Sequence, residues 1–318
     1  MSVVVGVDGG GSKTHAVALT LQGEVVGRGE GPGSSPHICG VERSLEIVDA
    51  AVLQALAGDT ATQANVYLSG LDLDVEVAEY RAGVAGLEWS APGTIVANDL
   101  WALLRAGTEA TDAVAIVCGT GINAVGVRAD GATARFDALG PISGDWGGGS
   151  GLGEEALWHA ARAEDGRGPA TALRAAVLEG MGVGSIHELT EQLHFGHRAM
   201  PDLAVLAPAV FAAARAGDAI AGTIVDRQAS EVVAFARACL TRLELLGADV
   251  PVVLGGGVIR ARDERLLAGI TTQLAADAPH ARIVIVDAPP IVGAGLLALE
   301  SAGASRAALA RAREELSS

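Results

Sequence analysis

The stretch "GVDGGGSKTH", residues 6–15, lies between the apolar run "SVVV" at residues 2–5 and "AVALTL" at residues 16–21. Apolar residues that meet three consecutive glycines and then resume at once predict two β-strands joined by a tight turn. A second turn, "QG", predicts a third strand and hence a hairpin succession. The expected strands are residues 3–7, 14–21 and 23–28.

The opening pattern returns near the middle of the chain. Residues 113–127, "AVAIVCGTGINAVGV", again give an apolar strand, a glycine-threonine turn and a second strand, and "ATARFDAL" predicts a third. Helical periodicity at residues 41–56 and apolar runs at 64–70 and 93–98 predict alternating helices and strands after the first meander. After the second meander, residues 153–247 are mostly helical before further strands.

This repetition predicts an α/β protein with two duplicated domains. The N-terminal domain is expected to span residues 1–112 and to be completed by the C-terminal helix at 291–318. The C-terminal domain is expected to span residues 113–290 and to carry the helical insertion.

Composition limits the partners. The net charge of −16 argues against a surface that neutralises nucleic-acid phosphates. The longest apolar stretch, residues 203–214, is too short to span a bilayer, so no membrane partner is expected. Cys39, Cys118 and Cys239 are odd in number and far apart, which indicates a reducing compartment. We therefore expect a cytoplasmic protein, with a homodimer left open.

The glycine turn of residues 9–14 has two interpretations. It is either a flexible hairpin turn or a cradle whose backbone N–H groups approach phosphate oxygens, with hydroxyl donors from Ser12 and Thr14. Recurrence favours the cradle, because "CGTGIN" and "LGGGVI" place further glycine clusters after strands. Neither the G-x-x-x-x-G-K-[ST] loop nor a helix-opening G-x-G-x-x-G pattern is present here.

The order of "GVDGGGSKT", "ANDLWAL", "CGTGINA", "GPISGDWGGGSGLG" and "VVLGGGV" resembles the actin, hexokinase and heat-shock chaperone ATPase superfamily. Within it, the chain most resembles the N-acetylglucosamine kinases and the BadF/BadG/BcrA/BcrD ATPases. The resemblance implies two duplicated actin/ribonuclease H-like lobes with a nucleotide cleft between them. It also implies ATP and Mg²⁺.

By the same resemblance, Asp8 would hold the Mg²⁺ ion. Two glycine turns would cradle the phosphates, and a third glycine cluster would pack beneath the adenosine. The phosphate residues implied are Gly10, Gly11, Ser12, Lys13, Thr14, Gly119, Thr120 and Gly121. The adenosine residues implied are Gly255, Gly256 and Gly257.

Asn98 and Asp99 follow a predicted strand and precede a helix, so either could simply cap that helix. The resemblance instead implies that Asp99 is the catalytic base for a sugar hydroxyl and that Asn98 lies beside it. Asp145 precedes a glycine-rich turn and could be a turn former, and Asn123 could be an ordinary strand residue. The resemblance instead places Asp145 at the sugar or at the catalytic end of the cleft, and Asn123 near the substrate.

The segment "GPGSSPHICG", residues 31–40, corresponds to a loop that grips the sugar in the resembled kinases. Ser35 stands where those kinases commonly have asparagine, His37 where they have an aromatic residue, and Ile122 where they have a small polar one. The sequence therefore predicts an ATP-dependent kinase for the 6-hydroxyl of N-acetylglucosamine or a close amino sugar. Glucosamine or another hexose stays an alternative substrate.

Two other functions are less well supported. A BadF-type ATPase that activates a redox partner would need cysteines clustered around an iron–sulfur group, and these cysteines are scattered. A sugar sensor that binds DNA would need a helix-turn-helix before the first strand and a basic surface, and the sequence shows neither.

Overall fold

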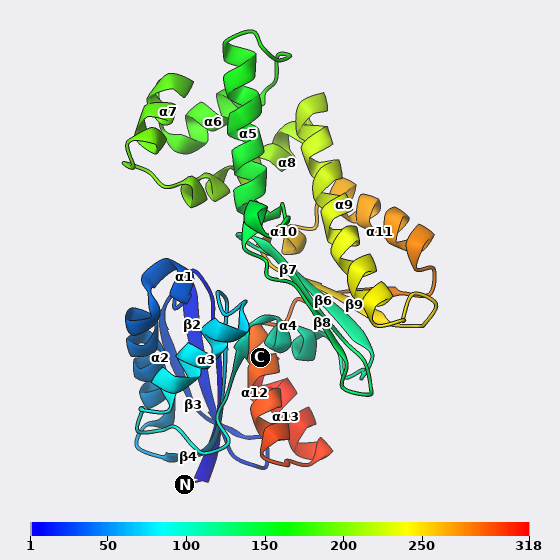
Figure 1. Cartoon of the computed structure of the whole chain (residues 1–318). Helices are drawn as coiled ribbons and strands as arrows, with labels where there is room; N and C mark the ends of the chain where they lie inside the picture. The colour runs from blue at the N-terminus through cyan, green and yellow to red at the C-terminus, as the bar shows by residue number, and fades with distance from the viewer. Residues whose placement is uncertain (1, 318) are drawn as a thin grey trace. The chain divides into compact units, whose positions relative to one another are not determined.

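A computed structural model describes residues 2–317. The chain divides into two compact units (Figure 1). Unit 1 consists of residues 1–115 together with 286–318, and unit 2 consists of residues 116–285. Unit 1 is therefore built from both ends of the chain.

Unit 1 contains a five-stranded sheet in the order β3-β2-β1-β4-β5. β2 is antiparallel to β1 and to β3, whereas β4 is parallel to β1 and to β5. The carboxyl ends of β1, β3, β4 and β5 consequently lie at one edge of the sheet. The strands are β1 (Ser2–Gly9), β2 (Lys13–Leu19), β3 (Val25–Pro32), β4 (Thr60–Leu68) and β5 (Ile95–Asn98).

The two faces of this sheet form separate cores, because successive side chains of a strand point to opposite faces. Val3, Val5 and Val7 pack in one core with residues of α2 and α3, while Val4 packs in the other core with α12 and α13. The helices are α1 (Pro36–Cys39), α2 (Val41–Leu56), α3 (Asp74–Val84), α4 (Leu100–Gly107), α12 (Pro290–Ser301) and α13 (Arg306–Ser317).

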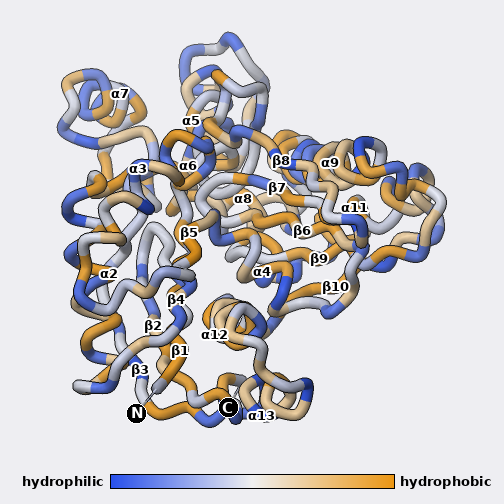
Figure 2. The backbone as a smooth tube through the Cα atoms, turned by 60° about the horizontal axis from the view of Figure 1, so that its bottom comes forward, coloured by the Kyte–Doolittle hydropathy of each residue, from blue (hydrophilic) through white to orange (hydrophobic). Residues whose placement is uncertain are grey.

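Unit 2 repeats the topology. Its sheet order, read from the other edge, is β8-β7-β6-β9-β10. This matches β3-β2-β1-β4-β5 of unit 1 strand for strand, with β6 in the central place of β1. Figure 2 shows hydrophobic residues along β6, β7 and β9. The strands are β6 (Ala113–Cys118), β7 (Ile122–Val127), β8 (Thr133–Arg135), β9 (Pro251–Gly255) and β10 (Arg282–Ile285). The predicted duplicated α/β fold is confirmed.

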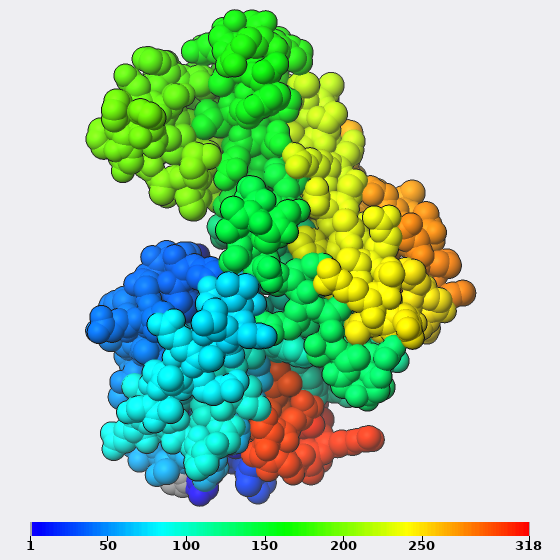
Figure 3. Space-filling model, in the orientation of Figure 1, coloured from blue at the N-terminus to red at the C-terminus, as the bar shows by residue number. Residues whose placement is uncertain are grey.

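Most helices of unit 2 form the insertion between β8 and β9. α9 packs against α11 and β7, and α5 packs against α6 and η2. Figure 3 shows the side chains of α5, α6 and α7 gathered at one end of unit 2. The helices are η1 (Gly140–Ile142), α5 (Gly148–Glu164), α6 (Leu173–Met181), α7 (Ile186–His194), η2 (Met200–Leu206), α8 (Ala207–Arg215), α9 (Ala219–Arg242), α10 (Gly257–Arg260) and α11 (Glu264–Asp277).

Among residues 2–317, no single helix is both long and apolar enough to cross a membrane. Met200–Arg215 and Ala219–Arg242 meet the length and composition criteria only as a pair, and that pair is bent by 116°.

Candidate active site

The carboxyl edge of the unit 1 sheet carries three aspartates. Asp8 lies near the end of β1, Asp72 follows β4, and Asp99 follows β5. The Asp99 N–H donates to the carbonyl oxygen of Leu68 at 3.2 Å, which extends the sheet ladder and fixes Asp99 at this edge. Burial, together with the negative charges of Asp8 and Asp72, raises the pKa of Asp99 to about 8. A carboxyl group tuned in this way suits proton transfer near neutral pH.

Asn98 orients the segment around Asp99. Its side chain is buried, its Nδ2 donates to Asp72 Oδ1 at 2.9 Å, and its Oδ1 accepts the N–H of Leu100 at 3.0 Å. The start of α4 is therefore capped by the Asn98 side chain, as one sequence interpretation allowed. The Asp99 side chain makes no capping hydrogen bond.

The glycine turn between β1 and β2 is braced by the segment after β3. Thr14 Oγ1 lies 2.7 Å from both the Pro32 carbonyl oxygen and Ser34 Oγ, and the Ser34 N–H donates to the Gly10 carbonyl oxygen at 3.0 Å. Thr14 is fully buried, whereas residues 11–13 are exposed. Thr14 thus holds the shape of the turn, and the residues before it face solvent.

His37 lies in the short helix α1, within the segment of residues 33–40 that is called the loop below, and it faces two carboxylates. Its Nε2 is 2.7 Å from Glu76 Oε1, and its Nδ1 is 3.9 Å from Asp72 Oδ2. The ligand atoms of these three residues lie within 4.8 Å of one another. The two ring nitrogens face different carboxylates, and the contact with Glu76 is the one within hydrogen-bond distance.

Asp72 and Glu76 were missed by the sequence analysis. Both lie within "YLSGLDLDVE", residues 67–76, which begins in β4. Asp72 follows a parallel strand, as Asp99 does, and an acidic residue at this position indicates a ligand-binding edge of the sheet. Glu76 is the third residue of α3 and accepts the N–H groups of Asp72 and Leu73 at 3.0 and 2.8 Å. An acidic residue at this position is typical of a helix start.

Unit 2 brings two of its glycine segments together. The Gly149 N–H donates to the Gly119 carbonyl oxygen at 2.8 Å, and the Ser150 N–H donates to the Thr120 carbonyl oxygen at 2.9 Å. The start of α5 therefore supports the β6–β7 turn. A Cβ atom added at Gly119 or Gly121 would meet nothing within 4 Å, so this turn has open space beside it.

The third glycine cluster reaches the end of β6. Gly256 has φ +92°, and a Cβ atom there would lie 2.2 Å from the Cys118 carbonyl oxygen. Only glycine fits this close approach without a shift of the backbone. Residues 255–257 therefore pack against the residue that immediately precedes the Gly119–Gly121 turn.

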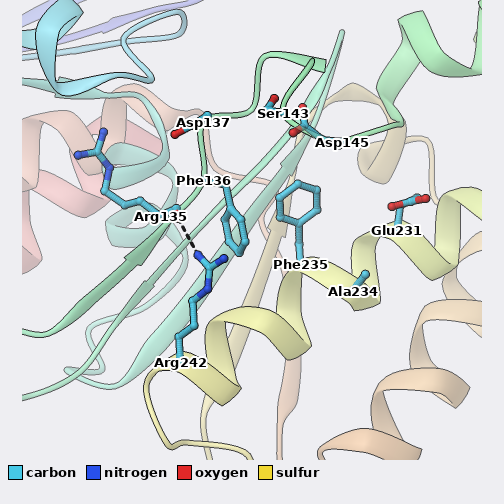
Figure 4. Close-up of a pocket in the computed structure, with 10 residues that line it drawn as sticks. Arg135, Phe136, Asp137, Ser143, Asp145, Glu231, Ala234, Phe235 and Arg242 are labelled. Carbon is cyan, nitrogen blue, oxygen red and sulfur yellow. Dashed lines mark hydrogen bonds between the residues drawn. The ribbon is translucent and has the colours of Figure 1, made fainter. Parts of the chain in front are cut away.

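The remaining sugar candidates lie elsewhere in unit 2. Asn123 is buried in β7, where its Oδ1 lies 2.6 Å from the N–H of Ala124. Asp145 accepts the Gly140 N–H at 2.6 Å and lines a pocket of about 330 Å³ (Figure 4). In this pocket the ring of Phe136 lies edge-on to Phe235, and the Arg242 guanidinium stacks on Phe136.

The carboxylates of unit 1 fit a divalent cation. Carboxylate oxygens are ligands that Mg²⁺ accepts. Asp8 and Asp72 lie close enough to Asp99 to raise its pKa, and a bound cation would offset that repulsion.

The sequence profile of the BadF/BadG/BcrA/BcrD ATPase family matches residues 5–298. The chain belongs to this family. This BadF/BadG/BcrA/BcrD-family protein is 27% identical over 314 residues to a protein of Dictyostelium discoideum named N-acetyl-D-glucosamine kinase. That alignment covers 94% of this chain and 98% of the relative.

Two further comparisons agree with the family. The chain is 26% identical over 264 residues to a Clostridium acetobutylicum protein named N-acetylmuramic acid/N-acetylglucosamine kinase, covering 81% of this chain and 86% of the relative. A solved structure from Chromobacterium violaceum, provisionally named an N-acetylglucosamine kinase, is similar with a TM-score of 0.73 and 25% identity. That match covers 93% of this chain and 98% of the solved chain. The expected family resemblance is confirmed.

Proposed function

We propose that this protein is an ATP-dependent kinase that phosphorylates the 6-hydroxyl of N-acetylglucosamine or of a close amino sugar. The observation that carries the proposal is Asp99, a carboxyl group with a raised pKa at the sheet edge that also holds the glycine turn. Family membership and the names of the curated relatives support the same reaction.

Asp99 is the proposed base. Its carboxylate accepts the proton of the sugar hydroxyl and aligns the oxygen for in-line attack on the γ-phosphate. A pKa of about 8 makes the ionised group a stronger proton acceptor than an ordinary aspartate. Asn98 holds the Asp99 segment through its contact with Asp72.

The nucleotide is assigned to the glycine segments. The turn of residues 10–14 in unit 1 is proposed as a phosphate-binding turn, and so, separately, is the turn of residues 119–121 in unit 2. Residues 255–257 are proposed to contact the adenosine. Asp8 would hold Mg²⁺, which when bound neutralises charge on the transferred phosphoryl group.

Each unit, taken by itself, carries polar residues that we propose for sugar binding. In unit 1 these are Asn98 and the loop that contains Ser35 and His37, and in unit 2 they are Asn123 and Asp145. Ser35 is buried, and its hydroxyl would contact any side chain added at Gly70. The Ser35 side chain is shorter than the asparagine common in the resembled kinases and would contact the sugar differently. Glucosamine or another hexose therefore remains the alternative substrate.

An ADP-release assay across N-acetylglucosamine, glucosamine, N-acetylmannosamine and glucose tests the proposal. We expect turnover to be highest with an amino sugar and a 6-phosphate product by mass spectrometry and NMR. Asp99→Asn should lower kcat by about 10²–10⁴-fold, the range for loss of a general base, while ATP and sugar still bind by calorimetry. Nucleotide binding without turnover of any sugar would refute the proposal and favour an activator ATPase or a sensor.

A further inference from the structure

The loop of residues 33–40 is fastened to α3 through His37. Both ring nitrogens of His37 face carboxylates, Nε2 at 2.7 Å from Glu76 and Nδ1 at 3.9 Å from Asp72. Nε2 is within hydrogen-bond distance of Glu76, whereas Nδ1 is too far from Asp72 for a hydrogen bond, so the strongest contact of the ring commits it to Glu76 rather than to a sugar. Its position in the loop therefore calls for a different role.

Glu76 is itself fixed. Its Oε2 accepts the N–H groups of Asp72 and Leu73, so the carboxylate stands at the N-terminus of α3. Burial would raise the pKa of Glu76, but the Leu73 N–H and the His37 ring together outweigh this effect and lower the pKa. The partner of His37 is thus an ionised group that cannot move without disturbing the helix start.

Close packing adds a second contact between the loop and the segment before α3. Gly70 has φ +76°, and a Cβ atom there would lie 2.7 Å from Ser35 Oγ and 3.1 Å from His37 Cγ. The loop therefore rests directly on the backbone of Gly70. The hydrogen bond to Glu76 and this close packing together hold residues 35–37 in one place.

The same segment reaches the proposed base. Asp72 accepts a hydrogen bond from Asn98 at 2.9 Å, and Asn98 precedes Asp99. Residues 70–76 accordingly connect the loop around Ser35 with the strand end that carries Asp99. A shift of His37 would alter the position of the loop relative to that strand end.

We infer that His37 is a positioning residue: with Glu76 it forms a latch that holds residues 33–40 in the sugar-binding arrangement and thereby sets sugar affinity. This inference rests on the proposed kinase function. It differs from the sequence expectation, in which His37 contacts the sugar directly. The latch consists of His37, Glu76 and the Gly70 backbone.

The test uses the full chain with His37→Ala, Glu76→Gln and the double variant. Glutamine at residue 76 keeps an oxygen for the helix-start N–H groups but removes the charge that faces His37. His187→Ala is the matched control, because it breaks an exposed histidine–glutamate pair, His187–Glu191, in unit 2.

Three quantities are measured for each variant: hydrogen exchange, the sugar Kd and the KM for ATP. Hydrogen exchange of residues 33–40 in the unliganded protein should be faster in both single variants and unchanged in the control. The sugar Kd by calorimetry should rise about 10-fold for His37→Ala and about 3-fold for Glu76→Gln, as expected for a partly exposed pair. The double variant should bind no more weakly than His37→Ala, while the KM for ATP stays within about 2-fold.

Three results would overturn the latch. Unchanged exchange in both single variants would show that the loop is not held by this pair. An unchanged sugar Kd in Glu76→Gln, despite faster exchange, would show that the held loop does not serve the sugar. If the fold-changes in sugar Kd of the two single variants multiplied in the double variant, the two residues would act independently, and His37 would contact the sugar itself. Failure of the wild-type protein to bind any amino sugar would instead count against the proposed function.

Discussion

At the scale of single residues, the site is defined by the repulsion among acidic groups. Asp99 is half-buried and lies near Asp8 and Asp72, and both burial and these charges favour its protonated form. Folding therefore keeps this carboxyl group in an environment that is costly for its ionised form. Such a cost is typical of catalytic sites, which are arranged for the reaction rather than for stability.

Removing the Asp99 charge should stabilise the unliganded protein. Its folded pKa of about 8 lies above the ordinary aspartate value of 3.8, so the native state binds more protons than the unfolded state between these values. Stability from this group is therefore present below about pH 4 and is lost as the pH rises toward 8. Asp99→Asn, which does not titrate, should gain about 1–2 kcal/mol relative to wild type at pH 8.5, after allowance for partial exposure.

Thermal melting of both proteins at pH 5, 7 and 8.5, without divalent cations, measures this gain. Asp130→Asn is the control. Hydrogen bonds from Arg128 lower the pKa of Asp130 to about 2, so removing this carboxylate should not stabilise the protein as the pH rises. An advantage for Asp99→Asn that does not grow with pH would contradict the raised pKa.

The sequence predicted residues of the site that follow strand ends, and it missed residues whose role depends on contacts between segments. Asp99 follows an apolar run directly, but its proposed role as base was implied by the family resemblance, because the local pattern is also that of a helix cap. Ser34, by contrast, is recognised only through its contacts with Thr14 and Gly10, which lie about twenty residues earlier. Such contacts arise from strand pairing, which no local pattern specifies.

At the scale of elements, α9 contacts the start of α5 through Gln228, and the start of α5 in turn supports the Gly119–Gly121 turn of unit 2. This side chain is fully buried, and its Oε1 accepts the Gly148 N–H at 2.8 Å at the start of α5. Within residues 2–317, its Nε2 has no hydrogen-bond partner. A buried donor without a partner costs stability, so Gln228 is better explained by the position that it gives to α5.

Gln228→Leu should disturb nucleotide binding. Leucine leaves the buried Gly148 N–H without its acceptor, at a cost of about 1–3 kcal/mol, and frees the residues that support the Gly119–Gly121 turn. We expect the KM for ATP to rise about 10-fold and the sugar Kd to change less than 3-fold. Steady-state kinetics and calorimetry measure the two effects.

Ser230→Ala is the comparison variant, because Ser230 is exposed on α9 and bonds only within that helix. Equal losses for ATP and sugar in Gln228→Leu would indicate general destabilisation and contradict the specific role.

The elements themselves were predicted unevenly. The helix expected at 41–56 is α2 exactly as the structure has it. β3, however, extends to Pro32, beyond the expected end at residue 28. Alternating glycines weaken a strand signal, yet Gly27 and Gly29 leave room for α2, since a Cβ atom there would lie within about 2.0 Å of the helix carbonyl oxygens.

At the scale of the whole molecule, the two chain ends are required for one unit. α12 and α13 cover the second face of the unit 1 sheet, and their buried residues share a core with Val4, Val17 and Leu19. α13 lies in the range 291–318 that was expected as one C-terminal helix, but it is a separate helix, and its sequence, "RAALARAREELS", is rich in charge. Ala308, Ala312 and Leu316 nevertheless recur every four residues and form its buried stripe.

The net charge of −16 leads to the last prediction, because a strongly acidic protein must bind a polyanion. We expect saturating ATP with Mg²⁺ to raise the melting temperature, since a ligand at 100 times its Kd stabilises by about 2.7 kcal/mol. ATP with EDTA should give a much smaller shift. Differential scanning fluorimetry of wild type and Asp8→Asn measures both shifts, and Asp8→Asn should lose most of the Mg²⁺-dependent part.

Salt distinguishes a local need for the cation from a general effect of charge. The Debye length is about 10 Å at 0.1 M salt and 3 Å at 1 M, so high salt screens distant charges far better than carboxylates beside the phosphates. We therefore expect 0.5 M NaCl to restore only a small part of the ATP shift in EDTA. If salt fully restored the ATP-induced shift in melting temperature, or if the shifts were equal with and without Mg²⁺, ATP binding would depend on the overall surface charge. Either result would contradict the proposed role of Asp8.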